Sequence, residues 1–147
     1  MKKIIILTIM FVLVFTVASF AQQVPESFWE APLLLREGFD DMRGTTVSEV
    51  FREGEFKSNE NLDGTLSEVT WKDTNAIEGN SVYRTLLFLS GGEVVGTFEF
   101  VLWWNSNNKT VLLDSVTMTD HRSGDDITFT EFSDKVQMIG MISSLKK

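Results

Sequence analysis

Apolar and polar residues follow different patterns in successive stretches of the chain. Ile4–Phe20 is almost entirely apolar and carries no charge, whereas residues 22–81 mix apolar residues with polar turns. From Val82 to Trp104 the composition is typical of β-strands, and after Phe132 apolar residues recur every three or four positions, as on one side of a helix. The pattern predicts a leader, a mixed region, a sheet and a closing helix.

The strongest strand signals flank Gly91-Gly92. The runs Val82–Leu89 and Val94–Trp104 are rich in β-branched and aromatic residues, and a diglycine suits the positive φ angles of a two-residue hairpin turn. A hairpin closed by this turn has a register in which Arg84 lies opposite Glu99, an ion pair that a one-residue slip would lose. Further strands are predicted at Val69–Lys72, Thr110–Thr119 and Ile127–Thr130.

In that register the hairpin has a core face and a second face. The core face, which we expect beneath the helices, holds Tyr83, Leu87, Phe98, Phe100, Leu102 and Trp104. The second face holds Val82, Leu86, Phe88, Val95, Val101 and Trp103 around the Arg84–Glu99 pair. A face open to water would be less apolar, so this one is either covered or is a patch for a partner, a ligand or a homodimer. The residues expected to bind are Phe88, Val95, Val101 and Trp103.

Two short helices are predicted before the sheet. Pro32 suits the first turn of a helix that continues until Gly44. Thr46–Glu49 reads as a capping box, in which the Thr hydroxyl and the Glu carboxylate each accept from the other residue's amide, and the helix it starts would end at Gly54. The apolar positions of the two helices are Leu35, Phe39, Met42, Val47, Val50 and Phe51.

A longer amphipathic helix is predicted at the end of the chain. Its apolar residues form one stripe at spacings of four and three: Phe132, Val136, Ile139, Ile142 and Leu145. Lys146-Lys147 near its end suits the helix dipole. Together the patterns predict an α+β fold with N-terminal helical segments, an antiparallel β-meander of three to five strands and a C-terminal amphipathic helix.

The capped hexapeptide Thr46–Phe51 (Thr-Val-Ser-Glu-Val-Phe), followed by three antiparallel strands, resembles a layout seen in small exported α/β modules. Over roughly Thr45 to Thr119 the order of elements is similar to that of beta-lactamase-inhibitor-protein-like modules and outer-membrane assembly lipoproteins. The resemblance implies a module that binds other proteins and performs no chemistry. The chain differs from both groups in lacking cysteine, and therefore a lipidation site and a disulfide pair.

Composition narrows the function classes. The 147 residues suit one domain, and 21 Asp and Glu against 13 Lys and Arg give a net charge of −8. Such acidity argues against nucleic-acid binding and favours basic partners. The absence of Cys excludes a disulfide, a thiolate zinc site and a Cys nucleophile. We expect no cofactor and no metal.

Candidate catalytic and metal-binding motifs are sparse. His121, the only imidazole, lies in the acidic loop Asp120–Asp126, whose carboxylates could at most form an oxygen-only metal site. Asn59–Gly64 follows the spacing of a calcium loop, but Thr70 stands where the bidentate Glu belongs. We therefore expect an exported, non-enzymatic module that binds a protein or another envelope component. The alternatives are a small-molecule or lipid binder with an aromatic pocket between sheet and helix, and a small hydrolase using two carboxylates.

The first 21 residues have the three parts of a secretory signal peptide. Met1-Lys2-Lys3 is basic, Ile4–Phe20 is apolar, and Ser19 and Ala21 place small residues at the −3 and −1 positions of a cleavage site. Cleavage would leave residues 22–147 as a single α+β domain, with no stable membrane span, in the periplasm or outside the cell.

This assignment predicts that the exported protein begins at Gln22. N-terminal sequencing of the protein recovered from the exported fraction measures this directly. Recovery of a chain that retains Met1 in the membrane fraction would show an uncleaved anchor instead.

Overall fold

The computed structural model describes residues 23–35, 44–56, 66–72 and 77–147. The predicted signal peptide, residues 36–43 of the first predicted helix and the turn at Asn59–Gly64 lie outside the described residues. The helices are α2 (Glu26–Glu30), α3 (Val47–Phe51) and α4 (Phe132–Leu145). The strands are β1 (Leu33–Leu34), β2 (Glu68–Trp71), β3 (Ile77–Glu78), β4 (Ser81–Ser90), β5 (Glu93–Asn105), β6 (Thr110–Asp120) and β7 (Asp126–Phe129).

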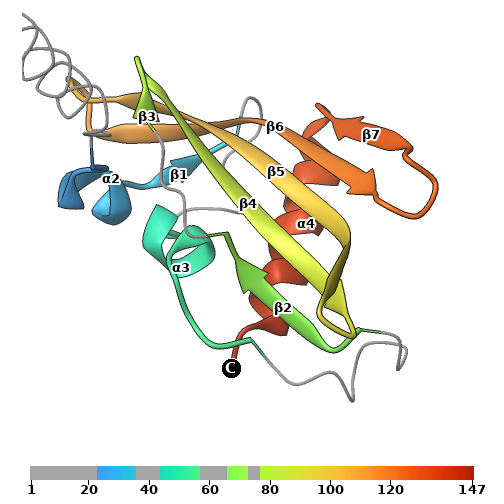
Figure 1. Cartoon of the computed structure of the whole chain (residues 1–147). Coiled ribbons are helices and arrows are strands. Elements are labelled where there is room, and N and C mark those ends of the chain that lie inside the picture. Colours follow the sequence, from blue (N-terminus) through green and yellow to red (C-terminus); the bar gives the residue numbers. More distant parts are fainter. Residues whose placement is uncertain (1–22, 36–43, 57–65, 73–76) are drawn as a thin grey trace, which may run out of the picture.

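The described strands form one sheet of seven, ordered β1-β6-β5-β4-β2, with β3 also beside β4 and β7 also beside β6. Figure 1 shows the long strands β4, β5 and β6 at the centre, with α4 along one face. All neighbouring strands are antiparallel except β1, which runs parallel to β6. The α+β prediction is confirmed, but the sheet is mixed and not the antiparallel meander that we expected.

The parallel strand replaces the helix predicted to start at Pro32. Leu33 lies opposite Val111 of β6, and the Pro32 carbonyl accepts a hydrogen bond from the Val111 amide. Ala31, Leu33 and Leu35 are buried while Pro32 is exposed, so burial alternates with a period of two. Three consecutive leucines fit a strand and a helix equally well, and the packing against β6 decides for the strand. The helix before it, α2, begins at Glu26, directly after Pro25.

The β4–β5 hairpin forms as predicted, but its register does not. Gly91 and Gly92 have φ angles of 59° and 83°, as a tight turn requires, and Leu89 pairs with Val94. Beyond that pair Val95 is an extra residue, a β-bulge, so that Phe88 pairs with Gly96.

From Phe88 back to Ser81, the bulge shifts the pairing of β4 with β5 by one residue. Each of these β4 side chains therefore lies on the opposite face of the sheet from the one predicted. Arg84 lies opposite Phe100 and not opposite Glu99, so the predicted cross-strand ion pair is wrong. The β5 side of the predicted core face is correct, because Phe98, Phe100, Leu102 and Trp104 are buried. On β4 the assignment is inverted: the buried residues are Val82, Arg84 and Leu86 in place of Tyr83 and Leu87.

The helices cover this buried face. The capping box of α3 is present as predicted, although the helix ends at Phe51 and not at Gly54. In α4 the predicted stripe is confirmed, with Ile139, Ile142 and Leu145 buried and Phe132 and Val136 partly buried. α3 contacts both α2 and α4, so residues from all three helices share one core with the sheet. Among the described helices, none is long and apolar enough to cross a membrane.

Arg84 is the largest fully buried side chain described, with 0% of its surface exposed. Its guanidinium carbon lies 4.6 Å from the ring centroid of Trp71 and 5.7 Å from that of Trp29. Its Nε donates to the Phe51 carbonyl at 2.9 Å, and Nη1 approaches the Lys72 carbonyl at 3.5 Å. The charge therefore connects β4 with α2, with the end of α3 and with the end of β2.

A comparison of two arginines tests this role. Arg52 also lies 5.7 Å from Trp29, but it is exposed and pairs with Glu26 on the surface. Arg84→Ala should lower the free energy of unfolding by about 3–5 kcal/mol, because it leaves a cavity and unpaired carbonyls. Arg52→Ala should lower it by at most about 1 kcal/mol. Urea denaturation measures both, and equal losses would contradict the structural role of Arg84.

Candidate functional site

The four residues predicted to bind do not share one face. Val101 and Trp103 lie on the face of the sheet opposite the core, and Trp103 is 43% exposed. Phe88 lies on the core side, where its ring meets that of Phe98 edge to face at 4.9 Å. Val95, the bulge residue, lies beside them. The predicted patch is thus divided into two separate surfaces.

Phe88 and Val95 line an open groove at the hairpin end of the sheet. Its volume is about 410 Å³, within the range of small-molecule sites. The apolar part of the wall consists of Leu66, Phe88, Val95, Phe98, Met118 and Met141. The polar residues of the lining are Thr97, Thr119, Asp120 and Arg122, of which Thr97 and Thr119 alternate with Phe98 and Met118 and so direct their side chains to the other face of the sheet. We call this set of residues the hairpin groove.

The Val95 bulge helps to shape the hairpin groove. It places the glycine at position 96 opposite Phe88, and a Cβ at Gly96 would lie 3.4 Å from the Thr119 carbonyl oxygen. The Val95 carbonyl accepts from the His121 amide at 3.1 Å, which connects the β6–β7 turn to the bulge. Apart from Phe88 and Phe98, the lining comes from Leu66, from residues 95–97 of β5, from residues 118–120 of β6, from the turn residue Arg122 and from Met141 of α4.

Methionine forms much of the remaining lining. Met118 is packed partly against the core, and Met141 on α4 is 37% exposed. An unbranched thioether adapts to different shapes, which is why methionine is frequent on surfaces that accept varied apolar ligands. No local sequence pattern marks either methionine as a binding residue, because Phe88 and Phe98 share a face only in the bulged register, which differs from the predicted one.

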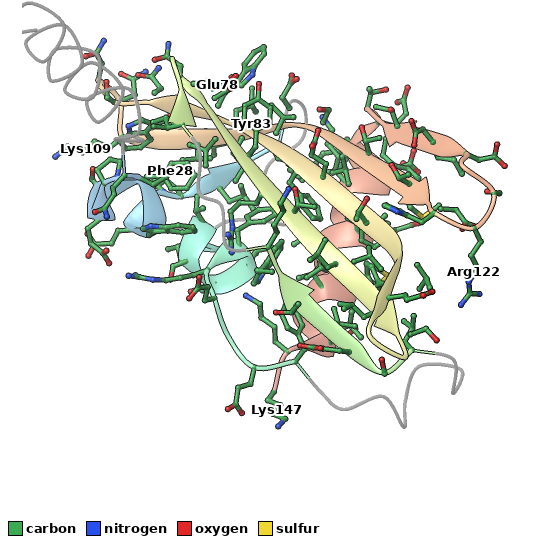
Figure 2. All side chains as sticks on the ribbon, viewed as in Figure 1. Phe28, Glu78, Tyr83, Lys109, Arg122 and Lys147 are labelled. Atoms are coloured by element: carbon green, nitrogen blue, oxygen red, sulfur yellow. The ribbon has the colours of Figure 1, made fainter. Side chains whose placement is uncertain are left out.

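The edge of the groove carries one basic and one acidic side chain. Figure 2 labels Arg122 on the β6–β7 turn, with its side chain directed away from the sheet. The Asp120 carboxylate accepts from the Arg122 amide at 2.8 Å and so closes this turn. The opposite charges leave the edge polar without making it strongly basic or acidic, which suits a ligand with a polar end and no large charge.

The β6–β7 loop uses its polar groups for its own structure. The Asp126 carboxylate accepts from the Thr119 hydroxyl at 2.7 Å, and the Ser123 hydroxyl accepts from the Asp125 amide at 3.3 Å. Within the described ranges there is no group of three or more His, Asp or Glu residues that could hold a metal ion. His121 is exposed and meets no carboxylate within salt-bridge distance among the described residues.

Large pKa shifts belong to two structural cations, the buried Arg84 and the half-buried Lys146. Burial lowers the pKa of Arg84 to about 10, partly opposed by Glu53. Burial, with the charge of Arg84, lowers the pKa of Lys146 to about 8. The Lys146 amine donates to the carbonyls of Glu49 and Arg52 at the end of α3. Perturbed pKa values often mark active sites, but these two groups lie in the packing between helices and sheet, outside the hairpin groove.

Comparisons with family models, with curated proteins and with solved structures find no match to this chain. The resemblance to exported inhibitor-like and assembly modules therefore stays a prediction.

The lowered pKa of Lys146 predicts a pH dependence of stability. The folded state releases the Lys146 proton near pH 8, whereas the unfolded state keeps it up to about 10.5. Between these values the unfolded state binds more protons, so this group makes the free energy of unfolding rise with pH. Between about pH 8 and 10.5, the free energy of unfolding measured by urea denaturation should rise more steeply with pH in the unsubstituted protein than in Lys146→Met. An identical slope in both proteins would contradict the assignment.

Proposed function

We propose that this chain is an exported, non-enzymatic binding module and that its ligand is a small apolar or amphiphilic molecule held in the hairpin groove. The observation that carries the proposal is the groove itself. It combines an apolar wall with a polar edge, and its volume of about 410 Å³ suits a small molecule.

The wall of the groove favours a ligand with an apolar body. Phe88 and Phe98 present two rings at right angles, with an interplanar angle of 86°, and the methionines at 118 and 141 supply adaptable surface. The Asp120 and Arg122 side chains provide hydrogen-bond partners among the groove's lining residues. A molecule with an apolar ring or short chain and a polar, uncharged end matches this arrangement.

This proposal differs from docking of a protein partner on one apolar sheet face, which we expected first. That mechanism needed Phe88, Val95, Val101 and Trp103 side by side, and the bulge separates them into two pairs. The hydrolase alternative needs a carboxylate held in its acid form. The hydrogen bond from Arg52 instead lowers the pKa of Glu26, which favours its ionised form.

Export remains part of the proposal and rests on the sequence of residues 1–21. The net charge of −8 fits a protein that stays dissolved outside the cytoplasm without affinity for nucleic acid. The same acidity disfavours strongly anionic ligands, which agrees with an uncharged polar end.

A fluorescent probe tests the proposal. The neutral fluorophore N-phenyl-1-naphthylamine should bind the exported protein saturably at one site, with increased emission. Met141→Arg should weaken binding by about tenfold, or about 1.4 kcal/mol, because it brings a hydrated charge to the apolar wall. Because Met141 is partly exposed, the substitution should leave thermal stability nearly unchanged.

Ser143→Arg is the matched control. It adds the same charge to α4 at an exposed position that does not line the groove, so probe affinity should stay as in the unsubstituted protein. Equal weakening in both variants, or no saturable probe binding at all, would refute the proposed function.

A further inference from the structure

A second recess lies at the other end of the sheet, away from the hairpin groove. It is bordered by the β3–β4 turn on one side and the β5–β6 turn on the other, and its volume is about 800 Å³. Trp103 of β5 is one of its lining residues, and it pairs with Ser81 of β4 on one side and with Leu112 of β6 on the other. In Figure 2 the labelled residues Glu78 and Lys109 mark this end of the sheet.

Both turns are held in place by hydrogen bonds. The Asn80 carbonyl accepts from the Trp104 amide at 2.7 Å, which fixes the β3–β4 turn to the end of β5. The Asn105 side-chain oxygen accepts from the amides of Asn107 and Asn108, both at 3.1 Å, and so closes the β5–β6 turn. The recess is therefore bordered by elements with defined positions on both sides of Trp103.

The chemistry of the lining is distinctive. Around the partly exposed indole of Trp103 stand three carboxamides and two serine hydroxyls, from Asn80, Ser81, Asn105, Ser106 and Asn107. None of the described side chains that line the recess is charged. Carboxamides and hydroxyls both donate and accept hydrogen bonds, whereas the indole face offers a flat apolar surface.

These features together match one class of ligand. A pyranose ring has a face of C–H groups that stacks on an indole, and a rim of hydroxyls that each donate and accept. An anionic or cationic ligand would meet no counter-charge among the described side chains of this lining, and a purely apolar one would cover the carboxamides and hydroxyls without replacing their hydrogen bonds to water. The hairpin groove has the opposite character, because its wall is apolar and its polar groups are confined to the edge.

We propose that the recess around Trp103 is a binding site for a neutral saccharide, with the sugar ring stacked on the indole and its hydroxyls bonded to the carboxamides of Asn80 and Asn107. This site is separate from the hairpin groove and does not depend on the ligand proposed there. It assigns a role to Trp103, one of the four residues predicted to bind, on the face opposite the core.

The experiment is an NMR titration of the exported protein. The neutral probes are maltose, cellobiose, lactose and N,N′-diacetylchitobiose, and an acidic galacturonate disaccharide is the charged comparison, each up to about 10 mM. We expect at least one neutral probe to shift the Trp103 indole N–H and the Leu112 amide saturably, with a dissociation constant of about 1 mM.

Variants identify the site. Trp103→Ala should weaken binding by about tenfold or more, as reported by the Leu112 amide, and Asn80→Ala should weaken it by about threefold. Trp103→Phe keeps a smaller ring and should bind with intermediate affinity, which separates loss of stacking from loss of folding. Met141→Arg should bind sugar normally, so failure of the groove proposal and failure of this one are distinguishable.

Three results would overturn the inference. One is the absence of any saturable shift at Trp103 with the neutral probes. Another is binding that Trp103→Ala leaves unchanged. The third is stronger binding of the acidic disaccharide than of every neutral one, because the described side chains of the lining carry no charge that could account for it.

Discussion

A positive charge buried beneath the sheet is the constraint on which most of this structure depends. Arg84 has no exposed surface, and a buried guanidinium is stable only where carbonyls and aromatic faces replace water. The described groups that do so come from separate elements: Trp29 in α2, the Phe51 carbonyl in α3 and Trp71 in β2. Lys146 extends this arrangement, because its amine donates to carbonyls at the end of α3 and ties the chain's C-terminal end to the same region.

Two bulges determine which side chains reach that buried region and which remain accessible. The extra residue Val95 puts Arg84 on the core side and leaves Trp103 on the opposite face. A second irregularity leaves Asp114 extra in β6, where the carbonyls of Leu113 and Asp114 accept from the buried amine of Lys135. At each bulge a carbonyl accepts a hydrogen bond from another part of the fold, from the β6–β7 turn at Val95 and from α4 at Asp114. Each bulge therefore also fixes the position of a neighbouring element. The first bulge also helps to shape the hairpin groove.

Much of the fold could be predicted from the sequence where the signal is local. The capping box at Thr46, the diglycine turn and the apolar stripe of α4 each depend on residues close together in the chain, and all three are present. The bulge at Val95 has no comparable local signal, since Val-Val-Gly fits a regular strand as well. Because of this one extra residue, the predicted faces of β4 are inverted and the predicted binding patch is divided between two surfaces. The burial of Arg84 could not be predicted for the same reason. Lys135 was missed for a related reason, because its acceptors lie far away in the sequence.

Cross-strand proton contacts between β4 and β5 test this arrangement most directly. Opposed residues of an antiparallel pair bring their backbones within about 4.5–5.5 Å, close enough for nuclear Overhauser effects. In an isotope-labelled sample, the backbone protons of Arg84 should contact those of Phe100, and Leu86 should contact Phe98. Contacts of Arg84 with Glu99 and of Leu86 with Thr97 would show a hairpin without the bulge, and would contradict the buried arginine and the hairpin groove together.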